Sequence, residues 1–153
     1  MKKGLCIFIM AIALISCDNE LYKAESKRIE GGTWNKDEVI IIPMGVKDTT
    51  STFDYFVTLR NTEDYPYENI FLFIDLEFPN GRTLRDTLGV DLTTVDGRWK
   101  GKGAGSSYDN RILVNRKMRF PLMGEYVFRI RQAMRVEELE GVQTVGIEFD
   151  YVQ

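Results

Sequence analysis

The sequence contains no histidine and only two cysteines, Cys6 and Cys17, in 153 residues. Catalysis by Ser-His-Asp or Cys-His groups needs a histidine, and most zinc sites are built from cysteine and histidine. These classes are excluded, together with haem held by histidine. An enzyme with this composition would have to use carboxylates, Lys, Tyr or Ser. Glycosidases need only two carboxylates, so that class stays open.

The sequence also lacks an apolar run long enough to span a bilayer. Its longest run covers residues 5–15, which is shorter than the roughly 20 residues a membrane helix requires. Lys2 and Lys3 precede this run, as in a secretory signal peptide. The run ends in Leu14-Ile15-Ser16-Cys17, which resembles a bacterial lipobox. We therefore expect residues 1–16 to be removed and Cys17 to carry a lipid; an uncleaved anchor helix is the alternative.

The expected processing changes both the charge and the thiol content of the chain. Loss of Lys2 and Lys3 moves the formal charge from −3 to about −5, and an acidic protein is poorly suited to bind nucleic acid. Cys6 is lost with the signal and Cys17 is occupied, so the mature chain has neither a free thiol nor a disulfide. Its acyl chains would hold it on a membrane surface. We expect no cofactor other than this covalent lipid.

Residues 17–36 are polar and mixed in charge, which is typical of a tether, although a strand starting near Glu30 is an alternative. Residues 37–153 have the length of one domain. Apolar and polar residues alternate along this part, as in Phe53 to Leu59 and Tyr126 to Ile130. Such a period of two indicates β-strands, and Asn80-Gly81 between two such runs predicts a hairpin.

The pattern therefore predicts an all-β protein, an antiparallel β-sandwich of about seven strands with immunoglobulin-like or jelly-roll-like order. A barrel is the main alternative. One short helical turn is expected at residues 134–140, closed by Gly141. Residues 121–124 are expected to form a turn that joins two neighbouring strands.

Two segments are candidates for a binding surface. The first, residues 59–69, combines Arg60, Asp64, Tyr65 and Tyr67, and tyrosines are common in recognition surfaces. Its alternative role is a structural corner in which Asn61 and Asp64 bond to the loop backbone and the rings cover the end of the core. The second is the glycine-rich segment 96–105.

Trp99 in this second segment could stack on a sugar or on a cation of a partner, or it could close one end of the sandwich. The segment lacks the Lys-Ser/Thr ending of a phosphate loop. A carbohydrate-binding module would use Trp99, Tyr65, Tyr67 and Tyr108, and at least two of these rings would need to be exposed and coplanar with a groove. Peptidoglycan or a surface glycan is therefore the alternative ligand class.

Other charged groups give weaker signals. Residues 91–97 lack the ligand spacing of an EF-hand loop, so we expect no metal, and no pair of acidic residues is placed across a predicted cleft. Arg129 and Arg131 share one strand face, and with Lys117 and Arg119 they could form a basic stripe for an acidic partner or lipid head groups. A simple solvated strand face is the alternative.

Several short motifs occur in one order along nearly the whole chain. They are the lipobox at Cys17 and residues 59–61, 64–67, 69–73, 86–88, 97–103 and 132–135. Together they resemble the gliding motility lipoprotein GldH family of Bacteroidota. The resemblance implies an envelope lipoprotein that is needed for gliding in motile members and has no known catalytic activity.

From these inferences we expect a non-enzymatic lipoprotein anchored in the cell envelope, in the outer membrane. It would bind another envelope protein of the gliding or associated secretion machinery through Arg60, Asp64, Tyr65, Tyr67 and Trp99.

Overall fold

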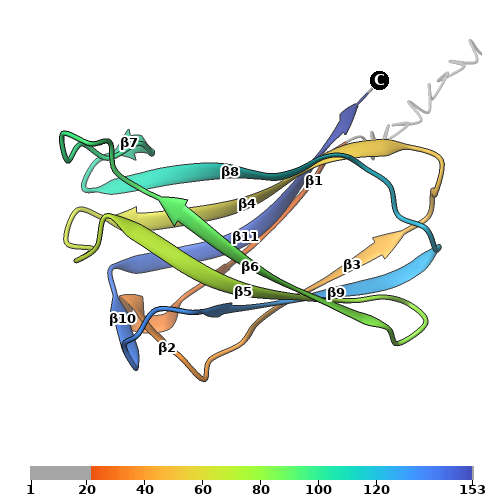
Figure 1. The fold of residues 1–153 in the computed structure, drawn as a ribbon, viewed down its shortest axis with the longest axis horizontal. Helices are drawn as coiled ribbons and strands as arrows, with labels where there is room; N and C mark the ends of the chain where they lie inside the picture. The colour runs from red at the N-terminus through yellow and green to blue at the C-terminus, as the bar shows by residue number, and fades with distance from the viewer. Residues whose placement is uncertain (1–21, 153) are drawn as a thin grey trace, which may run out of the picture.

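A computed structural model describes residues 22–152 as an all-β body (Figure 1). The elements are β1 (Tyr22–Arg28), the 3-10 turn η1 (Glu30–Gly32), β2 (Thr33–Asn35), β3 (Ile40–Val46), β4 (Thr52–Thr62), β5 (Asn69–Glu77), β6 (Thr83–Asp91), β7 (Lys102–Ala104), β8 (Ser107–Met118), β9 (Gly124–Gln132), β10 (Glu138–Glu140) and β11 (Val142–Val152). The sandwich prediction is confirmed, with eight long strands and three short ones among the described residues.

The strands form two main antiparallel sheets. One has the order β1-β11-β4-β8-β7 and the other β3-β9-β5-β6, and β10 pairs with β2 separately. Along the chain the long strands alternate between the two sheets, except for the β5–β6 hairpin. This connectivity is that of a jelly roll, in which two Greek keys share one core. The order of pairing therefore selects the jelly-roll-like form of the predicted sandwich.

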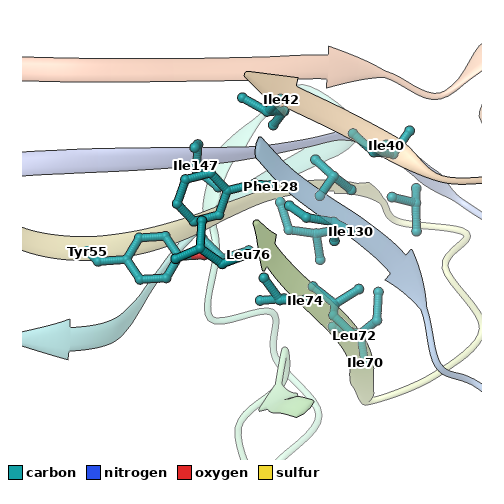
Figure 2. Packing of buried hydrophobic residues seen from close by; sticks show 14 of the residues in the cluster. Ile40, Ile42, Tyr55, Ile70, Leu72, Ile74, Leu76, Phe128, Ile130 and Ile147 are labelled. Atoms are coloured by element: carbon teal, nitrogen blue, oxygen red, sulfur yellow. The ribbon is translucent and has the colours of Figure 1, made fainter. Parts of the chain in front are cut away.

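The alternation of apolar and polar residues builds the core between the two sheets (Figure 2). In β3, for example, every second residue from Ile40 to Val46 is buried. Phe128 and Ile130 of β9 face Tyr55 and Ile147 of the other sheet in the same cluster. Burying such side chains stabilises the fold by roughly 1.5 to 3 kcal/mol each, and the strands β3, β4, β5, β9 and β11 each bury one face in this core.

The predicted hairpin at Asn80-Gly81 is confirmed between β5 and β6. Gly81 has a φ of 81°, which glycine adopts readily because it lacks a Cβ. Its N–H donates to the carbonyl oxygen of Phe78 at 2.9 Å. The turn sets the register in which Leu76 lies opposite Leu84.

Residues 121–124 do not join neighbouring strands, contrary to expectation. They carry the chain from β8 in the five-stranded sheet to β9 in the four-stranded sheet. Lys117 and Arg119 therefore do not lie beside Arg129 and Arg131, and no single basic stripe forms. Period two alone predicts two strands but does not decide whether they pair.

The segment expected to be a tether is partly folded. Residues 22–28 form β1, which pairs with β11 from Tyr22 opposite Asp150 to Arg28 opposite Thr144. Trp34 is fully buried and belongs to the core. Residues 22–36, which were expected to belong to the tether, are therefore part of the folded body. Residues 1–21, with Cys17 and the signal peptide, lie outside the described residues.

The expected helical turn at residues 134–140 is not formed. Residues 134–137 make a bend, and residues 138–140 are the strand β10, where Leu139 lies opposite Trp34 of β2. Leu139 and Trp34 are both buried. This packing overrides the weak local helical preference of a segment only two turns long. Within residues 22–152 there is no helix of the length and apolarity needed to cross a membrane.

Candidate partner-binding surface

The two segments that the sequence singles out meet at one end of the sandwich. We call this the loop end, defined as the β4–β5 loop (residues 63–68) and the β6–β7 loop (residues 92–101), which lie at the left of Figure 1. The N–H groups of Leu92 and Thr93 donate to the carbonyl oxygen of Glu68 at 2.8 and 3.2 Å. Glu63 N–H donates to the carbonyl oxygen of Ser106 at 2.9 Å. Two loops about thirty residues apart are thus fixed to each other through their backbones.

Three aromatic rings from these loops and one from β8 pack on one another. The ring centroids of Tyr65 and Trp99 are 6.3 Å apart, Tyr67 meets Tyr65 edge-on at 5.8 Å, and Trp99 stacks on Tyr108 of β8 at 5.4 Å. Offset and edge-to-face contacts of this kind each add about 0.5 to 1.5 kcal/mol beyond area burial. The rings therefore bind the loops to each other and to the end of the core.

Tyr65 has a structural role, as in the corner interpretation. It is only 4% exposed, and its hydroxyl donates to the carbonyl oxygen of Asn69 at 2.9 Å. Burial, followed by the neighbouring Tyr67, raises the pKa of this hydroxyl. Tyr67, Trp99 and Tyr108 are half-buried. None of the four rings is fully exposed, so the pair of exposed, coplanar rings that a glycan-binding site would need is not formed.

The charged candidates reach the surface beside these rings. Arg60 of β4 makes a two-pronged ion pair with Asp109 of β8, with N–O distances of 2.6 and 2.8 Å. The hydrogen bond from Arg60 lowers the pKa of the Asp109 carboxyl. Asp64 is exposed on the loop. Arg60 and Asp64 both line a polar cleft of about 630 Å³. Its other walls include Gly32, Glu140 of β10 and two residues of β11, Gln143 and Thr144.

Two asparagines hold this end together: Asn61, which the corner interpretation includes, and Asn110, which the sequence analysis did not select. Asn110 of β8 donates to the side-chain oxygen of Asn61 at 2.8 Å, and Asn61 donates to the carbonyl oxygen of Thr62 at 2.9 Å. Both asparagines are buried, where an unpaired amide would be costly. Both asparagines lie at positions where the alternation of apolar and polar residues in β4 and β8 directs side chains toward the core. This was the signal available in the sequence.

Gly141 also holds this end together, in a role that differs from the expected one. It does not end a helix but joins β10 to β11, with a φ of 82°. Its N–H donates to the carbonyl oxygen of Gly32, and its carbonyl oxygen accepts from Thr62. A Cβ at this position would lie 2.7 Å from the Cα of Tyr65, so only glycine lets these three segments approach so closely.

Among residues 22–152 no group of three or more acidic, cysteine or histidine side chains could hold a metal ion. Several carboxylates are instead engaged by arginines. Asp75 of β5 accepts from Arg85 at 2.6 Å and from Arg131 at 3.3 Å, and Arg129 pairs with Glu77 at 2.6 Å. Arginine side chains near Asp75, above all Arg85, lower the pKa of its carboxyl.

Comparison with known proteins places the chain in a family. The family model described as GldH lipoprotein matches residues 21–149. A protein named gliding motility lipoprotein GldH homolog, from Christiangramia forsetii, is 32% identical over 160 residues, covering 98% of each chain. The gliding motility lipoprotein GldH of Flavobacterium johnsoniae is 33% identical over 156 residues, covering 97% of this chain and 96% of that one.

Solved structures show only distant likeness. The infectious bursal disease virus VP2 subviral particle gives a TM-score of 0.41 at 8% identity, over 97% of this chain and 37% of that one. The Yersinia pseudotuberculosis-derived mitogen gives 0.34 at 5% identity, over 86% of each chain. The family model and both relatives span nearly the whole sequence, and the chain therefore belongs to the GldH lipoprotein family.

Proposed function

We propose that this protein is a lipid-anchored, non-enzymatic component of the cell envelope, in the outer membrane, and that its loop end binds another envelope protein. The partner belongs to the gliding machinery or to the secretion and envelope machinery associated with it. Membership of a lipoprotein family and the lipobox at Cys17 support the anchor. The observation that carries the proposal is the position of the loop end relative to the start of β1.

The described body begins at the end of the sandwich opposite the loop end. Tyr22, the first residue of β1, lies opposite Asp150 of β11, which in turn lies opposite Asp54 near the start of β4. The loop end follows the other end of β4, after Thr62. Tyr22 is five residues after Cys17, a span of at most about 18 Å. An anchor on Cys17 therefore holds the Tyr22 end near the membrane and turns the loop end away from it.

The loop end suits recognition of a protein because it is rigid before binding. The backbone hydrogen bonds between the loops and the Tyr65–Trp99 contact order the surface in advance, so less conformational entropy is lost on association. Arg60, Asp64 and the polar cleft supply charged groups at its rim. In this proposal Tyr65 and Trp99 support the surface, and the exposed polar groups contact the partner.

The state of the carboxylates supports a non-enzymatic role. A carboxyl group that acts as a general acid needs a raised pKa. Hydrogen bonds from arginine and lysine instead lower the pKa of the carboxyl groups of Asp75, Asp109 and Glu137. These groups serve ion pairs that join strands and loops.

The test is site-specific photocrosslinking of the full chain in living cells. A photoreactive amino acid at Asp64, on the loop end, should give a defined crosslinked protein. The same group at Met123, exposed in the β8–β9 connection at the opposite end, is the matched control and should not give that product. The charge reversal Asp64→Lys should weaken recovery of the partner, whereas Glu125→Lys at the far end should not.

Two results would contradict the proposal. The first is an identical crosslinking pattern from Asp64 and Met123, because the partner would then not distinguish the two ends. The second is mass spectrometry showing an intact, unmodified N-terminus in protein purified from the membrane, because the orientation depends on the lipid at Cys17.

A further inference from the structure

The two sheets leave an opening along one side of the sandwich. The strand β6 is the last strand of its sheet, and β7 covers β8 only over residues 107–109. Among the described residues no strand pairs with the outer edge of β6 or with β8 beyond that point. These two edges belong to different sheets, so side chains between them are the only closure of the core on this side.

The inner face of β6 is incompletely covered at this opening. Leu84 lies opposite the buried Leu76 and therefore on the core side of the sheet, because directly paired residues in antiparallel strands share a face. Yet Leu84 is 58% exposed. Asp86, opposite Ile74, faces the same way. An apolar position that should be covered by the second sheet is thus open to the surroundings.

A cavity of about 320 Å³ lies behind this opening. Its walls are mostly apolar and come from both sheets. They include Leu76, Phe78, Leu84, Val114, Met118 and Phe120. Ligand pockets in proteins have volumes from roughly 300 to 1,000 Å³, apolar walls and a few polar groups that fix orientation. The cavity satisfies the first two conditions.

The Tyr55 hydroxyl supplies the polar group. Tyr55 reaches from β4 toward Leu76 of the opposite sheet and lines the cavity (Figure 2). It is 6% exposed, and among residues 22–152 its hydroxyl oxygen is the one buried side-chain polar atom without a hydrogen-bond partner. Burial raises the pKa of this hydroxyl, and the charge of Asp86 raises it further. The hydroxyl therefore stays neutral, and its capacity for a hydrogen bond is unused.

The cavity lies at the end of the sandwich where the described chain begins. Tyr22 of β1 lies opposite Asp150 of β11, which lies opposite Asp54 of β4. Phe53, next to Asp54 in β4, lies opposite Met118 of β8, a residue of the cavity wall. Neighbouring strands are about 4.8 Å apart, so Tyr22 and Met118 are about three strand spacings apart at the same level. With the anchor on Cys17, the opening stands at the membrane-facing end.

We propose that this cavity binds one acyl chain of an uncharged membrane lipid, with an ester or hydroxyl oxygen of that lipid hydrogen-bonded to Tyr55. The inference rests on the proposed lipid anchor for its orientation. The apolar walls match an aliphatic chain, and the two charged residues that line the cavity, Asp86 and Arg119, have opposite signs and together match a head group without net charge. The anchor leaves the body on β1, on the other side of β11 and β4 from β8, so a lipid of the bilayer reaches the mouth more directly than the anchor's own chains.

A peptide strand is a weaker candidate for this site. A strand added to the free edge of β6 would use backbone groups at the sheet edge. The unpartnered group is instead the buried hydroxyl of Tyr55, a residue of the cavity wall. A ligand that enters between the sheets and carries an oxygen satisfies both the apolar walls and Tyr55.

The test is a titration of the mature-length chain, from residue 17, with 1-monododecanoylglycerol below its critical micelle concentration. Cys17→Ser removes the chain's own acyl groups and keeps every described residue. Calorimetry should show saturable one-to-one binding. Val114→Trp, which fills the cavity, should weaken binding at least tenfold, and Leu113→Trp, the exposed neighbour on the outer face of β8, should not. Tyr55→Phe should weaken it about fivefold, the value of one hydrogen bond.

Leu84→Asp provides a second variant in case Val114→Trp does not fold, since an exposed position tolerates the change. It should also weaken binding at least tenfold. Cooperative thermal unfolding of each variant checks the fold. Absence of saturable binding, equal binding by both tryptophan variants, or tighter binding of dodecanoate than of the neutral lipid would overturn the proposal. Failure of the lipidated chain to bind the probe, when Cys17→Ser binds it, would reassign the cavity to the anchor's own acyl chain and overturn the assignment to a bilayer lipid.

Because the Cys17→Ser chain carries no lipid, this titration reports on the cavity alone. A cavity that binds the lipid in a protein with an unmodified native N-terminus would contradict the anchor and leave the binding site standing. Loss of the Asp64 crosslink would bear on the loop end only. The two proposals can therefore fail separately.

Discussion

At the scale of single residues, Tyr55 and Tyr126 show how the surroundings of a buried hydroxyl decide its contribution to stability. The Tyr126 hydroxyl accepts from the N–H of Leu122 at 3.1 Å and donates to its carbonyl oxygen at 3.0 Å. The Tyr55 hydroxyl has no such partner among residues 22–152. Both rings are buried, so the two residues differ mainly in whether the buried hydroxyl has a hydrogen-bond partner.

Tyr55→Phe should therefore raise the free energy of unfolding by about 1 kcal/mol in the absence of lipid, because it removes an unsatisfied buried group. Tyr126→Phe is the matched control and should lower it by about 1 to 2 kcal/mol. Urea unfolding followed by circular dichroism measures both. If Tyr55→Phe proves as destabilising as Tyr126→Phe, the Tyr55 hydroxyl has a partner in the ligand-free protein.

At the scale of elements, the strands and loops are joined by a few specific contacts outside the main core. On the outer face of the four-stranded sheet, Asp75 of β5 connects β6 and β9 through Arg85 and Arg131. At the loop end, Gly141 lets three backbone segments meet. Each of these two contacts can be tested by one substitution with a matched control.

Asp75→Asn should lower the free energy of unfolding at neutral pH by about 1 to 2 kcal/mol, since it weakens two charge-assisted contacts. Arg85 lowers the pKa of Asp75 in the folded state. This contribution is thus present above the unfolded-state pKa of about 3.9 and is lost as pH falls through the lower folded-state pKa. Stability measured from pH 7 downward should show the variant and the wild type converge at acidic pH.

The control for Asp75 is Glu77→Gln. The Glu77–Arg129 pair is more than one-third exposed on both sides, so its loss should cost less than about 1 kcal/mol. Equal effects of the two substitutions at pH 7 would show that burial of Asp75 does not strengthen its ion pairs.

Gly141→Ala should lower the free energy of unfolding by at least about 3 kcal/mol. The change adds strain at a positive φ and sets a Cβ 2.7 Å from the backbone of Tyr65. Gly97→Ala has nearly the same φ, 80°, but nothing within 4 Å of the added Cβ, so it should cost only about 1 to 2 kcal/mol. Thermal unfolding compares them, and equal losses would mean that the close approach at Gly141 is readily relieved.

At the scale of the whole molecule, the sandwich separates two surfaces along its long axis. The loop end lies at one end, and β1 begins near the apolar cavity at the other. The N-terminal strand is part of this architecture, because β1 covers the edge of β11. An uncovered edge strand presents free backbone groups and favours aggregation.

Deletion of residues 22–28 should therefore lower the free energy of unfolding by several kcal/mol and promote aggregation, as size-exclusion chromatography and thermal unfolding would show. If the segment were only a tether, its removal would change neither property. Replacement of Lys102 and Ala104 of β7 by glycine is the control. It affects another edge strand whose pairing spans three residue pairs, and it should have a much smaller effect.

Much of the fold could be predicted because strand patterns are local. The alternation in residues 53–59 and 126–130 and the Asn80-Gly81 turn indicated paired strands with one buried face. The expected helix at 134–140 failed because the burial of Leu139 against Trp34 is a contact between segments about one hundred residues apart. For the same reason the sequence suggested a tether where β1 pairs with β11.

The structure brings the two loop candidates together at one end of the sandwich, and their role in binding a partner stays a prediction. Sequence reasoning selected Tyr65 and Trp99 because aromatic residues in loops can recognise partners. It could not show that they pack on each other, since the two loops meet only after the chain has crossed between sheets. Asn61, Asn110 and Gly141 act through long-range neighbours that composition does not reveal.

The sequence by itself determined the secondary-structure class and the absence of histidine chemistry, and it identified the family by motifs that keep their order along the chain. Only the tertiary structure decided the jelly-roll order of the strands, the burial of Tyr65 and the unpartnered hydroxyl of Tyr55. The physical reason is that side-chain period and composition are properties of neighbouring residues, whereas sheet order, burial and hydrogen-bond satisfaction depend on which distant strands come together.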